Sequence, residues 1–437
     1  MKKLDEFFHL TKYGTDVRTE IIAGTVTFMT MAYILVVNPT ILADAGMDYD
    51  KVFAATAIIS AISTLVMGLV ANLPFALSAG MGLNAFFTYT VCLTMGYSWR
   101  WALTAILFEG IIFLFLTLFN IREALVNCIP TSLKKAIGAG IGFYIAFIGL
   151  QNAGIVVDSS TLVTLNPSWF KGEAGIAMAG LAITTVLLVR KVKGAILIGM
   201  IATTLIGIPF GITSYAGGRY VPTAPYFFPF AFDEIFANGK SIFDFVIVLF
   251  TFLFIDMFDT VGTLIACAGK SGIIREDGSI PKCKEALLAD AIGTTGGALL
   301  GTSTVTTFVE SAAGVATGGR TGLTSVTTAV LFLLSLFLSP LFASIPGAAT
   351  APALIIVGVM MISPIREIDF DDYTEAIPAF LCILFMVCAY SISDGIMFGV
   401  LSYVLINTVT GNARKIEKMT WVLAACFLLR IVMQAII

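Results

Sequence analysis

The chain has 437 residues, of which 58% are hydrophobic and only 12% are charged, and its mean hydropathy is +0.96. These values lie far outside the range of soluble globular proteins and indicate a polytopic membrane protein, with the lipid bilayer as its surroundings. The formal net charge of −3 and the lack of a dense basic cluster give no indication of a nucleic acid partner.

The N-terminal segment, residues 1–18, is charged throughout and lacks the apolar core and cleavage site of a signal peptide. We therefore expect it to be a polar segment on the cytoplasmic side of the membrane. The seven cysteines show no paired spacing typical of a zinc site, so neither a metal nor a cofactor is expected.

Fourteen apolar segments follow along the chain, each about as long as a membrane-spanning helix. The sequence therefore predicts an all-α protein with fourteen transmembrane segments. A further apolar stretch, 419–437, contains Arg430 and is either a fifteenth span or a helix on the membrane surface. The fourteen segments are 19–43, 52–71, 75–95, 101–120, 134–154, 174–189, 194–211, 243–266, 284–300, 301–318, 322–343, 347–363, 376–391 and 394–410.

The basic residues of the loops predict the orientation of these segments. If the N-terminus is inside the cell, 19 of the 25 Lys and Arg residues fall in cytoplasmic segments, and 5 fall on the other side. Because cytoplasmic loops carry an excess of Lys and Arg, this bias favours fourteen spans with both chain ends inside.

The two halves of the chain show weak internal similarity. A stretch that begins with Pro130 opens the fifth segment as one that begins with Pro346 opens the twelfth, and Lys193-Gly resembles Asp394-Gly at the start of the seventh and fourteenth segments. Since seven is an odd number, a duplicated unit of seven spans must be inserted upside down the second time. The resulting inverted repeat predicts a substrate site at the repeat interface, near the middle of the membrane.

Two of the segments are predicted to be discontinuous. Residues 72–84 and 301–314 are rich in small and β-branched residues at the start of each segment, where a membrane helix should be strongest. Irregular backbone is tolerated at this depth only where protein or a water-filled cavity covers it. We expect a short extended piece followed by a half-helix in each, so that free N–H groups and the positive end of the helix dipole face a cavity.

Three carboxylic acids stand out in two of the apolar segments. Asp256 and Asp259 are three residues apart in 243–266, on roughly one helical face, and Glu310 is in 301–318. An aspartate at the centre of a membrane helix costs about 2.5–3.5 kcal/mol, and such acids usually mark ion relays or substrate sites. Neither segment contains a Lys or Arg, which disfavours ion pairing as their role. Because desolvation raises the pKa of a carboxyl group, such acids suit proton uptake and release.

Polar and aromatic side chains near these acids complete a candidate substrate site. The hydroxyls of Ser303 and Thr304 suit a neutral, planar ligand with many hydrogen-bonding groups, such as a nucleobase. Phe258 and Phe308 are the nearest aromatic residues, and they either stack on such a ligand or belong to the core. Thr27 makes the first segment more polar, and a hydrogen bond to its own helix is the alternative role for it.

For each of three acids, two roles remain open. Asp256 either handles a proton or caps a neighbouring half-helix. Glu109 in the fourth segment and Asp290 in the ninth either hold the structure by hydrogen bonding or assist proton transfer. The sequence leaves these alternatives open.

Three sequence blocks carry a resemblance to a known family. They are NLPFALSAGMGLNAFF from Asn72 to Phe87, FIDMFDTVGTL from Phe254 to Leu264, and GTSTVTTFVESAAGVATGGRTGL from Gly301 to Leu323. They closely resemble the signature blocks of the AzgA-like purine permeases, a branch of the nucleobase-cation symporter 2 (xanthine/uracil permease) family. The resemblance extends over nearly the whole chain, from Lys12 to about Asn412.

This resemblance implies a seven-plus-seven inverted repeat with a core (transport) domain and a gate domain, and commonly a homodimer. It also implies proton-coupled uptake of adenine or of guanine and hypoxanthine across the cell membrane, and of these we favour hypoxanthine and guanine, with adenine as a further candidate. The implied domains are an N-terminal segment 1–18, a core of 19–120 and 243–343, a gate of 134–211 and 347–410, and a C-terminal segment 411–437.

The resemblance also assigns site residues by motif match. Asp259 takes the place of the substrate-binding acid in segment eight, and Glu310 takes that of the acid in segment ten. Short strands are implied near 76–80 and 302–305, and Asp256 joins the two acids in proton coupling. The substrate-binding residues are expected to be Asp259, Glu310, Ala79, Gly80, Asn84, Phe258, Ser303, Thr304, Phe308 and Thr27.

Other functions compete with this one. Uracil and xanthine relatives often carry a histidine in or near segment eight, whereas Thr263 stands one turn after Asp259 here and the only histidine is His9. A uracil or xanthine permease of the same fold is therefore the first alternative. An intramembrane aspartyl hydrolase is less favoured, because the acids lie on one helix and lack the Gly-x-Gly-Asp context. An anion transporter of similar fold would need a positive site.

Overall fold

The computed structural model describes residues 2–119, 130–160, 162–215, 217, 220–237, 239–271 and 281–436. Each of the fourteen apolar segments predicted from the sequence corresponds to a helix or a broken helix in this part of the chain. Among the described residues, eight helices are long and apolar enough to cross a membrane alone. The other segments are shorter helices, broken segments or helices that include undescribed side chains.

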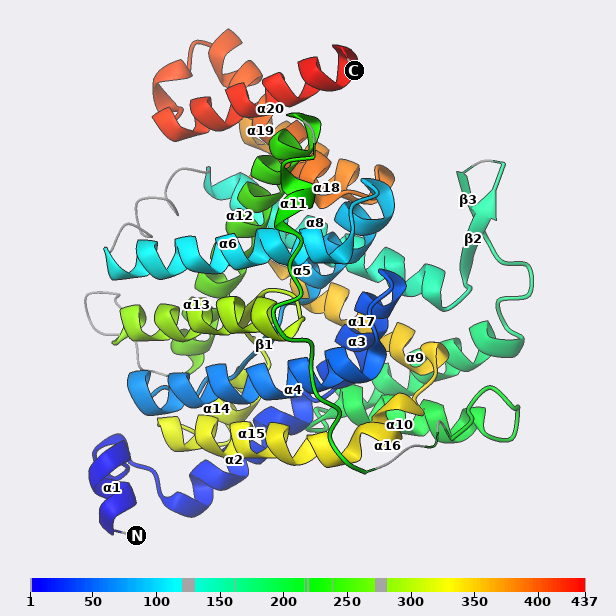
Figure 1. Cartoon of the computed structure of the whole chain (residues 1–437), viewed down its shortest axis with the longest axis vertical. Coiled ribbons are helices and arrows are strands. Elements are labelled where there is room, and N and C mark those ends of the chain that lie inside the picture. The colour runs from blue at the N-terminus through cyan, green and yellow to red at the C-terminus, as the bar shows by residue number, and fades with distance from the viewer. Residues whose placement is uncertain are drawn as a thin grey trace. The chain divides into compact units, whose positions relative to one another are not determined.

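In the first half of the chain, a short N-terminal helix precedes seven transmembrane segments, and a hairpin of two strands follows the fifth segment (Figure 1). The elements are α1 (Lys2–Phe8), η1 (Thr11–Tyr13), α2 (Val17–Met31), α3 (Ile34–Asp44), α4 (Tyr49–Val66), η2 (Met67–Ala71), β1 (Leu77–Ala79), α5 (Met81–Ala85), η3 (Phe86–Thr94), α6 (Trp99–Leu118), α8 (Thr131–Asn152), β2 (Val156–Ser159), β3 (Leu162–Leu165), α9 (Gly172–Val189) and α10 (Ala195–Gly207).

The second half repeats this order of long helices, with one broken segment in the corresponding third position. The elements are α11 (Phe232–Ile235), α12 (Gly239–Ser271), α13 (Cys283–Leu300), β4 (Val305–Thr307), α14 (Ser311–Ala316), α15 (Gly322–Ser335), η4 (Leu336–Leu338), α16 (Ser339–Ala343), α17 (Gly347–Met361), η5 (Ser363–Glu367), α18 (Tyr373–Cys388), α19 (Ile392–Val409), η6 (Ala413–Lys415) and α20 (Lys418–Ile436).

The chain divides into two compact units. One contains residues 1–119 and 149–356, and the other contains residues 120–148 and 357–437. Their boundaries cut through α8 and α17, so this division by compactness does not test the core and gate ranges expected from the sequence. Those ranges remain a prediction.

The two broken segments meet through a short antiparallel ladder of β1 and β4, in which Ala79 lies opposite Val305. Two further hydrogen bonds extend the ladder at its ends: the N–H of Gly80 donates to the Thr304 carbonyl at 3.0 Å, and the N–H of Phe308 donates to the Ala76 carbonyl at 2.9 Å. The predicted extended pieces in segments three and ten are therefore present.

The second strand begins three residues later than the range 302–305 predicted for it. The reason lies in the end of α13. Gly301 adopts a left-handed conformation with φ of 83°, and the N–H of Thr302 donates back to the Gly297 carbonyl at 2.8 Å. These residues close the last turn of the helix, and only later residues are free to pair with β1.

Two threonines satisfy the backbone on the outer edges of this ladder. The Thr64 hydroxyl accepts from the Leu77 N–H at 2.9 Å and donates to the Leu77 carbonyl at 3.2 Å. The Thr294 hydroxyl makes the same pair of contacts with Val305, at 3.3 and 3.1 Å. Thr64 is on the second segment and Thr294 on the ninth, so the repeat relates the two arrangements.

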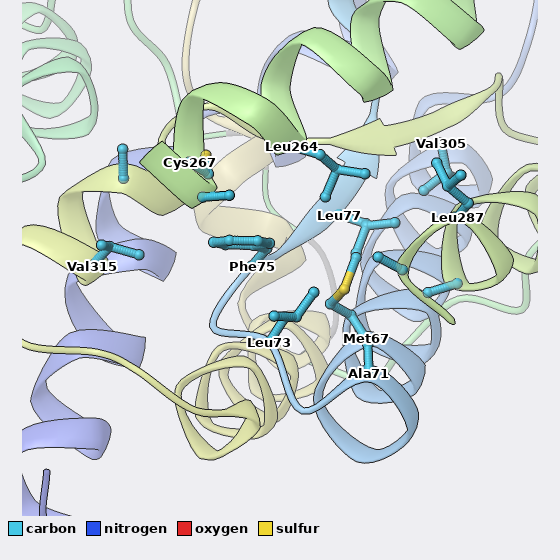
Figure 2. Packing of buried hydrophobic residues seen from close by; sticks show 14 of the residues in the cluster. Met67, Ala71, Leu73, Phe75, Leu77, Leu264, Cys267, Leu287, Val305 and Val315 are labelled. Carbon is cyan, nitrogen blue, oxygen red and sulfur yellow. The ribbon is translucent and has the colours of Figure 1, made fainter. Parts of the chain in front are cut away.

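A buried apolar cluster surrounds the ladder and fixes it to the helices around it. Leu77 and Val305 contribute one side chain from each strand, while Met67, Leu264 and Leu287 come from η2, α12 and α13. Figure 2 shows these side chains gathered around the two strands. Burial of such side chains contributes about 1.5–3 kcal/mol each, which favours one arrangement of the broken segments.

The helices around the ladder pack closely. α13 packs against both α6 and α4, and α15 packs against both α4 and α2 (Figure 1). The backbones come closest where η2 meets the start of α15: a Cβ atom on Gly322 would lie 1.9 Å from the Gly68 carbonyl oxygen. This crossing leaves no space for a side chain.

We expect Gly322→Ala to destabilise the protein by about 1–3 kcal/mol, because the methyl group has to push two backbones apart. The measurement is the thermal unfolding midpoint of purified protein in detergent. Gly138→Ala is the matched control, since a Cβ atom there meets nothing within 4 Å. The prediction is wrong if the two variants unfold at the same temperature.

Candidate functional site

The candidate site is built around the half-helices that follow the two strands. Gly80 precedes α5 and Glu310 precedes α14, each as the residue at the helix N-cap. Because β1 and β4 pair side by side, both helix starts lie at the ladder. The ladder thus brings residues far apart in the sequence to one place in the fold.

Glu310 is held by a tyrosine from the first segment. The hydroxyl of Tyr33 donates to Oε1 of Glu310 at 2.7 Å. Tyr33 is 1% exposed and lies at the break between α2 and α3. Sequence reasoning missed this residue, and the only signal for it was a tyrosine in an otherwise apolar stretch.

Asp259 of α12 lies in the same group. The hydroxyl of Thr306 on β4 interacts with its carboxyl group, and Glu310 and Tyr33 are within electrostatic range of it. The structure therefore brings together the two acids that the sequence singled out. Within the part of the chain that the structure describes, no Lys or Arg forms an ion pair with either acid.

Asp256 belongs to a neighbouring polar cluster. The Thr260 hydroxyl lies 3.1 Å from Oδ1 of Asp256 and 2.8 Å from Oδ1 of Asp290 on α13. All three residues are fully buried. The Thr260 hydroxyl has one hydrogen and can donate to only one of the two carboxyl groups. The other contact is a hydrogen bond if that carboxyl group carries a proton and donates it to the Thr260 oxygen. This arrangement tests neither of the two roles left open for Asp256, proton handling and helix capping.

Further polar side chains connect the residues just before β4 to α5 and α6. The Ser303 hydroxyl donates to Oδ1 of Asn84, and the Thr304 hydroxyl donates to Oε2 of Glu109 on α6 at 2.8 Å. Thr304 and Ser303 are therefore engaged within the protein. Glu109 acts here through hydrogen bonding to the start of the strand region, which was one of its two expected roles.

Some buried polar atoms have no hydrogen-bond partner among the described residues. They include Nδ2 of Asn84 and the hydroxyl groups of Thr27 and Thr307. Thr27 of α2 packs directly on α14, where a Cβ atom at Gly314 would lie 2.0 Å from its hydroxyl oxygen. Since buried polar groups normally have partners, these atoms are candidates for contact with a polar ligand.

The remaining expected site residues lie in or beside the ladder. Ala79 pairs with β4, and the N–H of Gly80 is already used by the Thr304 carbonyl. Phe308 is buried, and its carbonyl accepts from the thiol of Cys267 at 3.8 Å. The side chain of Phe258 lies outside the described part of the structure. Nothing in this arrangement tests whether the predicted residues touch a substrate.

Comparison with known proteins places this geometry in context. A family model described as the Permease family matches residues 18–398. The guanine/hypoxanthine permease PbuO of Bacillus subtilis is 43% identical over 97% of this chain and 99% of its own length. The adenine permease AdeQ of Escherichia coli is 41% identical over 98% of this chain and 96% of its own length.

A solved structure supports the fold. The transmembrane domain of the cyanobacterial bicarbonate transporter BicA superposes with a TM-score of 0.64 at 16% identity, covering 88% of this chain and 97% of that one. The likeness concerns the fold alone. Together with the observed elements, it supports fourteen segments in a seven-plus-seven inverted repeat, as the sequence predicts.

We expect Thr260→Val to lower stability by about 1–3 kcal/mol, because two buried carboxyl groups lose a hydrogen-bond partner while the side-chain shape is kept. Thr260→Ser retains the hydroxyl and serves as the control, with a smaller effect. Thermal unfolding of the two purified variants measures the difference. Equal unfolding temperatures would show that the hydroxyl does not stabilise the cluster.

Proposed function

We propose a function for this chain on the premise that it belongs to the Permease family: it carries purine nucleobases across the cell membrane together with protons. Hypoxanthine and guanine are the favoured substrates, ahead of adenine. The observation that carries the proposal is the group of Asp259, Glu310 and Tyr33 beside the paired strands.

The relatives support purines as the substrate class but differ on the base. PbuO is named a guanine/hypoxanthine permease and AdeQ an adenine permease, at similar identity to this chain. The site itself favours the former pair. Nδ2 of Asn84 is a donor without a partner among the described residues, and hypoxanthine and guanine present an exocyclic oxygen where adenine presents an amino group.

In this proposal Asp259 and Glu310 accept hydrogen bonds from N–H groups of the base, and Asn84 donates to its exocyclic oxygen. Tyr33 fixes the orientation of the Glu310 carboxyl group. A site built to hydrogen-bond a polar ligand rejects ligands that leave its buried groups unpaired, often by orders of magnitude. That property supports selection among bases that have nearly the same shape.

Carboxyl groups supply the proton coupling in this proposal, since the single histidine is His9, in the N-terminal segment. Asp259 and Glu310 lie in the substrate site, and Asp256 shares Thr260 with Asp290. These groups give the core a place to take up a proton on one side and release it on the other.

The proposal includes an N-terminus in the cytoplasm, which rests on the excess of Lys and Arg on that side. The Nζ atoms of Lys193, Lys282 and Lys284 donate to Thr317, Val70 and Leu118, respectively. Each contact joins residues that the orientation by basic residues assigns to the cytoplasmic side. The proposal also includes the core and gate ranges and a homodimer, which rest on the family resemblance.

The alternative functions are supported to different degrees. Membership of a permease family rules out the aspartyl hydrolase. The likeness to a bicarbonate transporter concerns the fold and does not support an anion substrate here, since Asp259 and Glu310 form no ion pair with Lys or Arg among the described residues. A uracil or xanthine permease remains the competing substrate assignment.

We expect excess unlabelled hypoxanthine and guanine to suppress uptake of radiolabelled hypoxanthine by cells expressing the protein, with adenine weaker and xanthine and uracil nearly without effect. A protonophore should lower accumulation, because it removes the driving gradient. Strong competition by uracil or xanthine alone would favour the competing assignment. Unchanged accumulation with the protonophore would contradict proton coupling.

We expect Glu310→Ala to reduce hypoxanthine uptake by about a hundredfold or more, since a buried group that pairs with the base is lost. The protein should still reach the membrane, as measured by surface labelling. Glu173→Ala is the matched control, because that glutamate is exposed in the first turn of α9. Normal accumulation by Glu310→Ala would refute the role of this acid.

A further inference from the structure

A hollow lies apart from the carboxylates of the candidate site. It has a volume of about 420 Å³ and lies where the N-terminal segment meets η2, the start of α13 and the turn before α15. Its lining includes neither Asp259 nor Glu310. The proposed transport function does not use it.

The lining of this hollow is cationic. The charged residues that line it, among those the structure describes, are Lys12, Lys282 and Arg320, and His9 adds a polar imidazole. The guanidinium of Arg320 donates to the carbonyls of Val315 and Gly319, at 2.7 and 2.8 Å. These bonds fix the position of the guanidinium, and within the described residues no carboxylate forms a salt bridge with it.

Two acids near the hollow in the described part of the chain, Asp5 and Glu20, are engaged in other hydrogen bonds. The Asp5 carboxylate accepts from the N–H and the hydroxyl of Thr11, both at 2.7 Å. The Glu20 carboxylate accepts from the N–H of Arg320 at 2.8 Å and from the Thr324 hydroxyl at 2.6 Å. Both acids are therefore used in holding the walls, and the basic groups of the hollow face a space that suits an anion.

The backbone around the hollow is strained in a way typical of functional sites. His9, Asn72 and Lys282 all have positive φ, at 57°, 53° and 54°, and all line the hollow. Such conformations cost about 1–3 kcal/mol each and persist where the surroundings enforce them. Asn72 provides one reason: its amide donates to the Phe8 carbonyl at 3.1 Å and accepts from the Gly322 N–H at 2.8 Å.

The rest of the lining is aromatic and apolar. Phe7 and Tyr13 come from the N-terminal segment, and Leu69 and Leu73 come from η2 and the chain just after it. We propose that this hollow binds a phosphate group carried on an aromatic or apolar body. Lys12, Lys282 and Arg320 contact the phosphate, since Lys and Arg are the usual donors to it, and Tyr13 and Leu73 contact the body.

Two sources could supply this chemistry, a nucleotide from solution or an anionic phospholipid. The test uses the full-length protein in nanodiscs. Binding of radiolabelled GMP is measured in discs of phosphatidylcholine alone, with inorganic phosphate as a competitor. Retention of phosphatidylglycerol is measured by native mass spectrometry after transfer from discs that contain it.

We expect saturable binding in one of these two arms and a loss of about tenfold or more in the double variant Lys12→Glu/Lys282→Glu, since contacts to charged groups are worth more than neutral ones. The matched control is Lys51→Glu/Lys171→Glu. This control changes the net charge by the same amount. Lys51 and Lys171 lie over aromatic rings, as Lys12 does, but neither of them lines the hollow.

The single variants Lys12→Ala and Tyr13→Ala keep the test decisive if the double variant does not fold. Both side chains are exposed, and both variants should weaken binding while leaving the unfolding temperature unchanged. The proposal is overturned if neither ligand binds, or if the variants of the hollow and the control pair bind equally. Because the readout is binding, failure here leaves the purine transport proposal untouched.

Discussion

Extended backbone inside a membrane has to find hydrogen-bond partners within the protein, and the rest of this structure depends on how β1 and β4 meet that requirement. An unpaired backbone group in hydrocarbon costs several kcal/mol. The strands pair with each other on one edge. On the other edge, Thr64 and Thr294 each use a single hydroxyl as acceptor and donor, so that Leu77 and Val305 have both backbone groups satisfied.

This solution also determines where the site lies and how it can move. β1 belongs to the first half of the chain and β4 to the second, so the ladder joins the two repeats at the point where the half-helices begin. The cluster around Leu77 and Val305 then buries both strands among several helices. Separating the half-helices would break the ladder and expose that cluster. Alternating access therefore requires the helices that hold the ladder to move as one body.

Much of this could be predicted from the sequence because the relevant signals are local. Hydrophobic length gives the fourteen segments, and the small residues in 72–84 and 301–314 give the two breaks. The acids stand out because an apolar segment makes any Asp or Glu conspicuous. Asp259 and Glu310 are brought into one group, whereas contact of the expected residues with a substrate stays a prediction.

The features that escaped prediction depend on contacts through space. Thr64 lies thirteen residues before its strand partner and Thr294 eleven residues before its own, so no common spacing marks the pair. Tyr33 meets Glu310 across 277 residues. The shift of β4 follows from the way α13 ends at Gly301, a local geometry that residue propensities in the strand do not contain.

The two acidic clusters are connected, and the connection bears on how a proton and a substrate could be coupled. Asp290 accepts from Thr260, which also contacts Asp256, and it lies within electrostatic range of Asp259. In the transport proposed above, the charge state of Asp290 is therefore linked to that of Asp259. Because linkage is reciprocal, a ligand that needs Asp259 in one charge state must in turn change proton affinity at Asp290. In that proposal the arrangement gives proton coupling a route that needs no histidine, through Asp256, Asp259 and Thr260 on α12 and Asp290 on α13.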